Sequence, residues 1–271
     1  MNASRKNDFG EYLAEFVGTF VFLFCGIGCV AGLKLAGASF GQWEVSITWG
    51  LAVTMGVYLS AGVSGAHLNP SVTIALAFFG CFEKRKIVPF ILAQTLAGFC
   101  AAGLVYALYK NLFAAALTAA AGDAAQTTAL AGVFCTFPNP GISMVQAFLT
   151  EMVITAILMS LIMALTDDGN GVPRGAMAPL LIGFLVALIG ASFGPLTGFA
   201  MNAARDFGPR LFAYFAGWGS DVMTGYPLSD LITIPYFIIP LTAPIVGACL
   251  GAVIYKSMIG KNLPCNCKLD A

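Results

Sequence analysis

The stretches SGAHLNPS at residues 64–71 and TGFAMNAAR at residues 197–205 follow one pattern. In each stretch a glycine is followed four residues later by an asparagine, and a short apolar run lies beyond it. Asn69 and Asn202 belong to different halves of the chain, and each half is predominantly apolar. Internal repeats of this kind place a site near the middle of the membrane in many transport proteins.

The repeat extends back to the start of each half. AEFVGTF at residues 14–20 parallels TEMVITA at residues 150–156, so Glu15 and Glu151 take equivalent places. The length of chain from Glu15 to Asn69 is nearly the same as that from Glu151 to Asn202. The two halves are therefore predicted to be repeats of one unit.

The composition indicates a membrane protein. Hydrophobic residues make up 59% of the chain and charged residues 10%, and the mean hydropathy is +0.86. Soluble domains are about 45–50% apolar and about 25% charged. The formal net charge is zero, so nothing suggests nucleic acid as a partner. The first apolar run, residues 12–33, is too long for the apolar part of a signal peptide and predicts a retained span.

Six apolar runs reach or approach the length of about 20 residues that a helix needs to cross a bilayer. We expect an all-α membrane protein with spans at residues 12–33, 43–61, 87–109, 144–165, 177–195 and 234–255. The inverted repeats would cover approximately residues 12–109 and 144–255 of a single membrane domain, residues 1–271.

Basic residues predict the orientation. Nine of the thirteen Lys and Arg would lie on one side of the membrane, and the positive-inside rule makes that side cytoplasmic, together with both termini. These nine are Arg5, Lys6, Lys84, Arg85, Lys86, Arg174, Lys256, Lys261 and Lys268.

The segments around Asn69 and Asn202 are not ordinary loops. Each is a glycine-bearing extended stretch followed by a short apolar run, residues 72–79 or 207–215, about half the length of a span. Non-helical backbone at membrane depth is tolerated only where protein buries it or a water-filled cavity receives it. Two re-entrant half-helices of opposite direction would meet at the centre and together cross the membrane.

Asparagine is among the best N-cap residues, and Pro70 suits the first helical position. We therefore expect Asn69 and Asn202 to cap the half-helices at the centre of a pore. Each helix N-terminus carries about half a positive charge, so two of them would repel cations. The asparagine amides would still offer N–H donors to a passing hydroxyl.

These residues resemble the major intrinsic proteins, or aquaporins, and within them the bacterial glycerol facilitators. The resemblance covers nearly the whole chain, including GASFGQWE at residues 37–44 and TDDGNGVPRG at residues 166–175. It implies six helices plus two half-helices in a homotetramer with one pore per subunit, within the lipid bilayer of the inner (plasma) membrane. The implied activity is passive conduction of glycerol and related small polyols, with some water and without protons or ions.

The resemblance also implies the selectivity filter: Trp49, Phe199 and Arg205. Water-selective relatives carry a histidine in the fifth span where this chain has Gly190, which implies a wider, half-apolar slot. The CH groups of a polyol would lie against the aromatic rings while its hydroxyls bond Arg205. The first half-helix begins with the family's Asn-Pro pair, as Asn69, Pro70 and Ser71. The second departs from the family pattern, with Asn202 followed by Ala203 and Ala204.

Other interpretations stay open for some of these residues. Arg205 is alternatively a structural cation, and Trp49 and Phe199 are alternatively packing residues. Glu15 and Glu151 are intramembrane carboxylates, for which we favour acceptance of hydrogen bonds from the extended loops over a proton relay. The sole histidine, His67, is expected to brace a loop or to line the cytoplasmic mouth.

Two further functions compete with a polyol channel. A water-selective pore would need a narrower and more polar filter, and a secondary transporter would use Glu15 or Glu151 as a proton site. An enzyme is not expected, because the chain shows no pairing of nucleophile and base. With one histidine and no cluster of metal ligands, no cofactor or metal is expected either.

Overall fold

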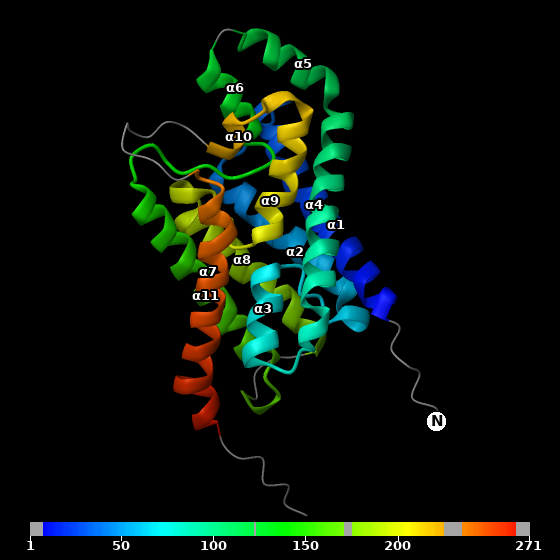
Figure 1. Ribbon diagram of the computed structural model, residues 1–271, viewed down its shortest axis with the longest axis vertical. Coiled ribbons are helices and arrows are strands. Elements are labelled where there is room, and N and C mark those ends of the chain that lie inside the picture. Colours follow the sequence, from blue (N-terminus) through cyan, green and yellow to red (C-terminus); the bar gives the residue numbers. More distant parts are fainter. Residues whose placement is uncertain (1–7, 122, 171–174, 225–234, 264–271) are drawn as a thin grey trace, which may run out of the picture.

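The computed structural model describes residues 8–121, 123–170, 175–224 and 235–263. Six of its helices are long and apolar enough to cross a membrane, which confirms the all-α fold with six spans. The spans are α1 (Asp8–Leu35), α2 (Gln42–Ser64), α4 (Ile87–Leu108) together with the turn before it from Lys84, α7 (Met144–Thr166), α8 (Ala178–Thr197), and α11 (Ile238–Ile254) together with the turns that continue it to Asn262. Figure 1 shows them as one bundle. The chain is thus a multi-pass membrane protein.

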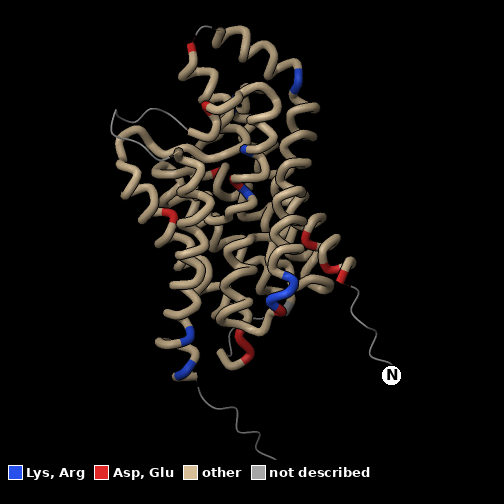
Figure 2. The backbone as a smooth tube through the Cα atoms, viewed as in Figure 1, with Lys and Arg blue, Asp and Glu red and all other residues tan. Residues whose placement is uncertain are grey.

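The long helices are apolar on the faces that point away from the bundle as well as on those inside it. A helix that is hydrophobic all round suits a surrounding lipid solvent. Large side chains on the outward faces are exposed, among them Leu51, Met55, Leu92, Leu149, Val153, Leu188 and Val246. Charged residues lie instead mostly toward the ends of the bundle, with a few at interior positions (Figure 2).

Small residues let the helices cross closely. A Cβ atom on Gly183 of α8 would lie 2.5 Å from the carbonyl oxygen of Gly50 on α2. A Cβ atom on Gly251 of α11 would lie 2.9 Å from the Cα of Ala156 on α7. Such close approach of backbones is how helices associate in lipid, where no hydrophobic driving force acts between them.

Two short helices lie inside the bundle, α3 (Pro70–Phe79) and α9 (Ala203–Ala213). In Figure 1 they follow one another along the long axis of the molecule, with their first residues at the middle. The apolar runs at residues 72–79 and 207–215 predict later starts for both helices than the structure shows. Helix α9 also ends at Ala213, two residues before the end of its apolar run. The first turn of α9 is polar, so an apolar-run criterion misses it, whereas its cap fixes where the helix begins.

The N-caps are Asn69 and Asn202. The side-chain oxygen of Asn69 accepts a hydrogen bond from the backbone N–H of Ser71 at 2.8 Å. The side-chain oxygen of Asn202 accepts from Ala204 at 3.0 Å and from Arg205 at 3.1 Å. Each cap therefore satisfies backbone donors that a helix start leaves without a partner.

Several shorter elements are not predicted, because the search for spans considers only long apolar runs. Two helices, α5 (Lys110–Ala119) and α6 (Ala124–Ala131), form a hairpin at one end of the bundle (Figure 1). The others are α10 (Asp221–Thr224), the 3₁₀ turns η1 (Lys84–Lys86), η2 (Asp168–Asn170), η3 (Gly175–Met177) and η6 (Gly260–Asn262), and the π turns η4 (Tyr214–Trp218) and η5 (Tyr255–Ile259).

Replacing Ala203 by proline should stabilise the protein by about 0.4–1 kcal/mol, because proline restricts the unfolded chain at a site that accepts it. Asn202 precedes this position with φ −152° and ψ 113°, nearly the values of Asn69 before Pro70, which are −157° and 120°. Thermal unfolding in detergent measures the change. The matched control is Ala204→Pro, which removes the N–H bonded to Asn202 and should destabilise. A lower melting temperature for Ala203→Pro would contradict this prediction.

Candidate functional site: two capped loops and a narrow pore

The two loops before the half-helices share an unusual backbone. Residues with positive φ recur at matching places in both, at Gly65 (86°), Ala66 (51°) and Leu68 (49°), and at Gly198 (77°), Phe199 (40°) and Met201 (50°). The left-handed region is uncommon for residues other than glycine and persists only where the surroundings fix it. The same conformation in both halves of the chain indicates that both loops are held by equivalent contacts.

Glu15 on α1 holds the first loop. Its carboxylate accepts hydrogen bonds from the Ser64 hydroxyl at 2.7 Å and from the backbone N–H groups of His67 at 2.9 Å and Leu68 at 2.7 Å. Gln94 on α4 donates a fourth bond at 2.7 Å. Backbone donors at membrane depth need partners inside the protein, and this buried carboxylate supplies them.

Glu151 on α7 holds the second loop in the same way. Its carboxylate accepts from the Thr197 hydroxyl at 2.6 Å and from the backbone N–H groups of Ala200 at 2.9 Å and Met201 at 2.8 Å. Each of these donors takes the same place in its loop as a donor to Glu15. The hydroxyl contacts are not predicted, although a Ser or Thr directly before the glycine occurs in both copies.

The two loops are also bonded to each other across the centre. The side-chain amide nitrogen of Asn69 donates to the carbonyl oxygen of Met201 at 2.9 Å, and that of Asn202 donates to the carbonyl oxygen of Leu68 at 2.7 Å. The pair of bonds joins the two half-helix tips. Because an amide has two N–H donors, each asparagine retains one beyond this bond.

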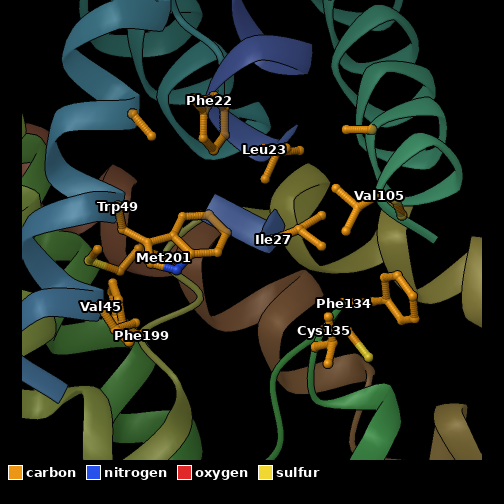
Figure 3. Close-up of a cluster of buried hydrophobic side chains, with 14 of the residues drawn as sticks. Phe22, Leu23, Ile27, Val45, Trp49, Val105, Phe134, Cys135, Phe199 and Met201 are labelled. Carbon is orange, nitrogen blue, oxygen red and sulfur yellow. The ribbon is translucent and has the colours of Figure 1, made fainter. Parts of the chain in front are cut away.

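Trp49, Phe199 and Arg205 meet at one level of the bundle. The Trp49 and Phe199 ring centroids are 6.3 Å apart at an interplanar angle of 80°, and the Arg205 guanidinium carbon lies 4.1 Å from the Trp49 ring centroid. All three are buried, with 3%, 5% and 8% of their surfaces exposed. Figure 3 shows Trp49, Phe199 and Met201 close together within the cluster of buried hydrophobic side chains. Two aromatic rings and one cation thus border the same narrow space.

Arg205 is held from outside this space by a buried loop. Its Nη1 donates to the carbonyl oxygen of Phe134 at 3.3 Å. The Phe134 ring packs in a cluster with Phe113 and Trp218, with centroids 5.2 and 5.6 Å away. Figure 3 shows Phe134 and Cys135 on the far side of the cluster from Trp49. This carbonyl contact is not predicted, since no motif marks residues 132–137.

A buried ion pair fixes the same loop. Arg210 and Asp206 lie one turn apart on α9, with Arg210 Nε 2.7 Å from the carboxylate. Asp206 also accepts from the backbone N–H and the hydroxyl of Thr136, both at 2.7 Å, while Arg210 donates to the Thr136 carbonyl at 2.6 Å and to the Val222 carbonyl. Buried charges are tolerated when further hydrogen bonds satisfy them, as here.

A cavity of about 470 Å³ connects these parts. Trp49, Phe199 and Arg205 line it, as do Asn69 and Asn202, and it continues to residues at the end of α7 and the start of α8. Pro70, Ser71, Ala203 and Ala204 are buried in the first turns of the half-helices. The two caps therefore border the same cavity as Trp49, Phe199 and Arg205.

Gly190 has a different surrounding from the one the sequence suggested. A Cβ atom there would lie 2.8 Å from Cε2 and 2.9 Å from Cζ of Phe199. The Phe199 ring therefore occupies the space that a side chain at residue 190 would need.

His67 lines the cavity on the α3 side of the centre. Its Nδ1 lies 3.1 Å from the Thr73 hydroxyl, and its ring packs against Phe82 and Phe90 with centroids 4.5 and 5.2 Å away. Within the described residues no group of three or more His, Cys, Asp or Glu side chains could hold a metal ion. His67 is thus placed as a packed loop residue with one edge at the cavity.

Replacing Glu151 by glutamine should lower the free energy of unfolding by about 1–3 kcal/mol, the cost of leaving a buried donor without an acceptor. Both carboxylate oxygens accept hydrogen bonds. In the glutamine variant an NH₂ group replaces one of them, so it would face the backbone N–H of Met201 or of Ala200, donor against donor. Thermal unfolding in detergent gives the measurement. Glu44→Gln is the control, because Glu44 accepts from Gly41 at the exposed N-terminus of α2. Equal stability of both variants would refute the bracing role.

Comparisons with known proteins agree with this geometry. The sequence model of the family described as "Major intrinsic protein" matches residues 2–255. The chain is 61% identical over 259 residues to the glycerol uptake facilitator protein of Escherichia coli K12, covering 95% of this chain and 90% of that protein. It is 58% identical over 273 residues to the propanediol uptake facilitator of Citrobacter freundii, covering 100% and 98%.

Among solved structures, the X-ray structure of the aquaglyceroporin from Plasmodium falciparum superposes with a TM-score of 0.80 at 33% identity. The superposition covers 93% of this chain and 97% of that one. Family match, sequence identity and fold thus point the same way as the paired loops and their caps. The chain belongs to the major intrinsic protein family.

Proposed function

We propose that this protein is a passive channel for glycerol and related small uncharged polyols, which also passes some water and excludes protons and ions. One observation carries the proposal: two aromatic rings and a guanidinium group lie within a few ångströms of one another and line the same cavity. The names of the relatives, which refer to uptake of glycerol and of propanediol, support it.

The chemistry of the filter suits a polyol. A polyol has a face of CH groups and an edge of hydroxyls, and Trp49 and Phe199 offer apolar surface while Arg205 offers N–H donors. The remaining N–H donors of Asn69 and Asn202 would receive a hydroxyl oxygen at the centre. Along this path, hydrogen bonds to these protein groups would replace the hydrogen bonds that the polyol makes with water.

Ion exclusion follows from the charges along the path. The N-termini of α3 and α9 meet at the centre, where each contributes about half a positive charge. Arg205 adds a full positive charge at the filter. A hydronium or sodium ion therefore meets an electrostatic barrier that a neutral polyol does not.

The arrangement in the membrane follows from the same features. The halves would be inverted repeats. Lys256 donates to the carbonyl oxygen of Phe79 at the end of α3, so it lies at the same end of the bundle as Lys84, Arg85 and Lys86, and Lys261 follows shortly after it. By the positive-inside rule this end would face the cytoplasm. Both termini would lie on that side of the inner membrane. Four further basic residues of the sequence prediction, Arg5, Lys6, Arg174 and Lys268, lie outside the described residues. Within the lipid bilayer the protein would form a homotetramer, as the family resemblance implies.

The two competing functions have less support. A water-selective pore needs a polar filter. In this protein the apolar ring of Phe199 occupies the space beside Gly190. A proton-coupled transporter needs an accessible carboxylate. In the described part of the chain, neither Glu15 nor Glu151 lines the cavity, and both are committed to hydrogen bonds with the loops.

Purified protein in liposomes tests the function by stopped-flow light scattering. Glycerol should enter rapidly without any pH gradient, while sucrose should not enter. Saturable uptake that requires a proton gradient would overturn the passive mechanism, and water flux without glycerol flux would favour the water-selective alternative.

Replacing Arg205 by valine should let protons leak, because the substitution removes the positive charge at the filter. We expect proton permeability to rise about tenfold or more, which corresponds to a barrier lower by about 1.4 kcal/mol. A pH-sensitive dye inside the liposomes reports the flux. Lys110→Val is the control, since Lys110 is an exposed cation on α5. If Arg205→Val still excludes protons, then Arg205 does not contribute to the proton barrier.

A further inference from the structure

We infer that Gln42 is a positioning residue for the filter, because its side-chain amide fixes the spacing between α2 and α8 where Phe199 is seated. The inference rests on the proposed function and deepens it: it names a residue that sets which polyols fit. Gln42 is the first residue of α2 and does not touch the permeating solute in this proposal.

The Phe199 ring lies in a slot formed by two glycines one turn apart on α8. A Cβ atom on Gly190 would be 2.8 Å from Cε2 of the ring, and one on Gly194 would be 3.0 Å from Cδ1. Real Cβ contacts are rarely that short, so a side chain at residue 190 would move the ring toward the cavity, whereas one at residue 194 would first displace the Gln42 amide. The depth of this slot sets where the aromatic wall stands.

Gln42 closes the slot from the side of α2. Its Nε2 donates to the carbonyl oxygen of Gly190 at 2.9 Å and to the Ser46 hydroxyl at 3.3 Å. The Ser46 hydroxyl donates its own hydrogen to the backbone carbonyl of Gln42 at 2.7 Å. The two N–H groups of the Gln42 side chain are thus both used, one by Gly190 and one by Ser46. The same Nε2 occupies the space that a Cβ on Gly194 would need.

This clamp acts on the separation of the filter walls. Trp49 belongs to α2, while Phe199 is seated against α8. The two helices are in close contact at Gly50 and Gly183, about 12 Å along α2 from Gln42 at about 1.5 Å per residue. The Gln42 amide therefore holds α2 and α8 together on one side of this crossing, between the start of α2 and the C-terminal part of α8. Without this amide, one of the contacts that hold the C-terminal part of α8 and the Phe199 ring near Trp49 is lost.

Gln42→Met tests the inference, because methionine keeps the length of the side chain and loses both donors. We expect the ratio of erythritol to glycerol permeability to rise by about threefold, a change typical of losing one hydrogen bond. Stopped-flow light scattering of proteoliposomes measures both fluxes in one preparation. The matched control is Gln146→Met, which removes a glutamine amide from the first turn of α7, away from the filter.

Gly190→Ala gives a second test that moves the Phe199 ring in the opposite direction. The new methyl group would lie against the Phe199 ring, 2.8 Å from Cε2, while the backbone carbonyl of residue 190 would still accept from Gln42. The ratio of glycerol to water permeability should fall by about threefold, which corresponds to a change in barrier height of about 0.6 kcal/mol. Both variants are compared on the same ratio: the ratio of erythritol to glycerol permeability should rise in Gln42→Met and fall in Gly190→Ala, whereas a general loss of structure lowers all fluxes together. Unchanged ratios in both variants, with rapid glycerol entry in the unaltered protein, would overturn the inference. Absence of glycerol entry in the unaltered protein would instead contradict the proposed function.

Discussion

The structure depends on how two stretches of non-helical backbone are satisfied in the middle of a membrane protein. Their N–H groups cannot reach bulk water, so each must find an acceptor inside the chain. Glu15 and Glu151 each accept two of these groups and a neighbouring hydroxyl. The left-handed residues of the loops are what bring those donors onto one carboxylate. The glutamates are therefore structural partners of the loops, whatever solute the pore conducts.

Once the loops are fixed, the positions of the caps follow. Each asparagine uses its oxygen to cap its own helix and one N–H to hold the opposite loop. The half-helices are thereby joined tip to tip, and their partial positive charges fall at one place. On the α9 side the same helix carries Arg205, Asp206 and Arg210, which connect the filter to the loop at residues 132–137. Filter and centre are thus parts of one bonded framework.

Much of this fold could be predicted because the relevant signals are local. Long apolar runs give the spans, and the asparagines mark the helix starts, since capping depends on a few neighbouring residues. Apolarity alone places the starts of α3 and α9 too late, because it ignores the cap. Contacts between distant elements could not be predicted from the sequence. Nothing in it indicates that the Phe134 carbonyl accepts a hydrogen bond from Arg205. Nor does it indicate that the Phe199 ring fills the space beside Gly190.

The central claim is that a polyol passes the filter with its carbons against Trp49 and Phe199 and its hydroxyls toward Arg205. An experimental structure determined with glycerol present tests this most directly. The arrangement requires density for glycerol at the level of these three side chains, with at least one hydroxyl within hydrogen-bond distance of the guanidinium. Glycerol bound in the cavity with its hydroxyls facing the rings, or excluded from this level altogether, would contradict the claim.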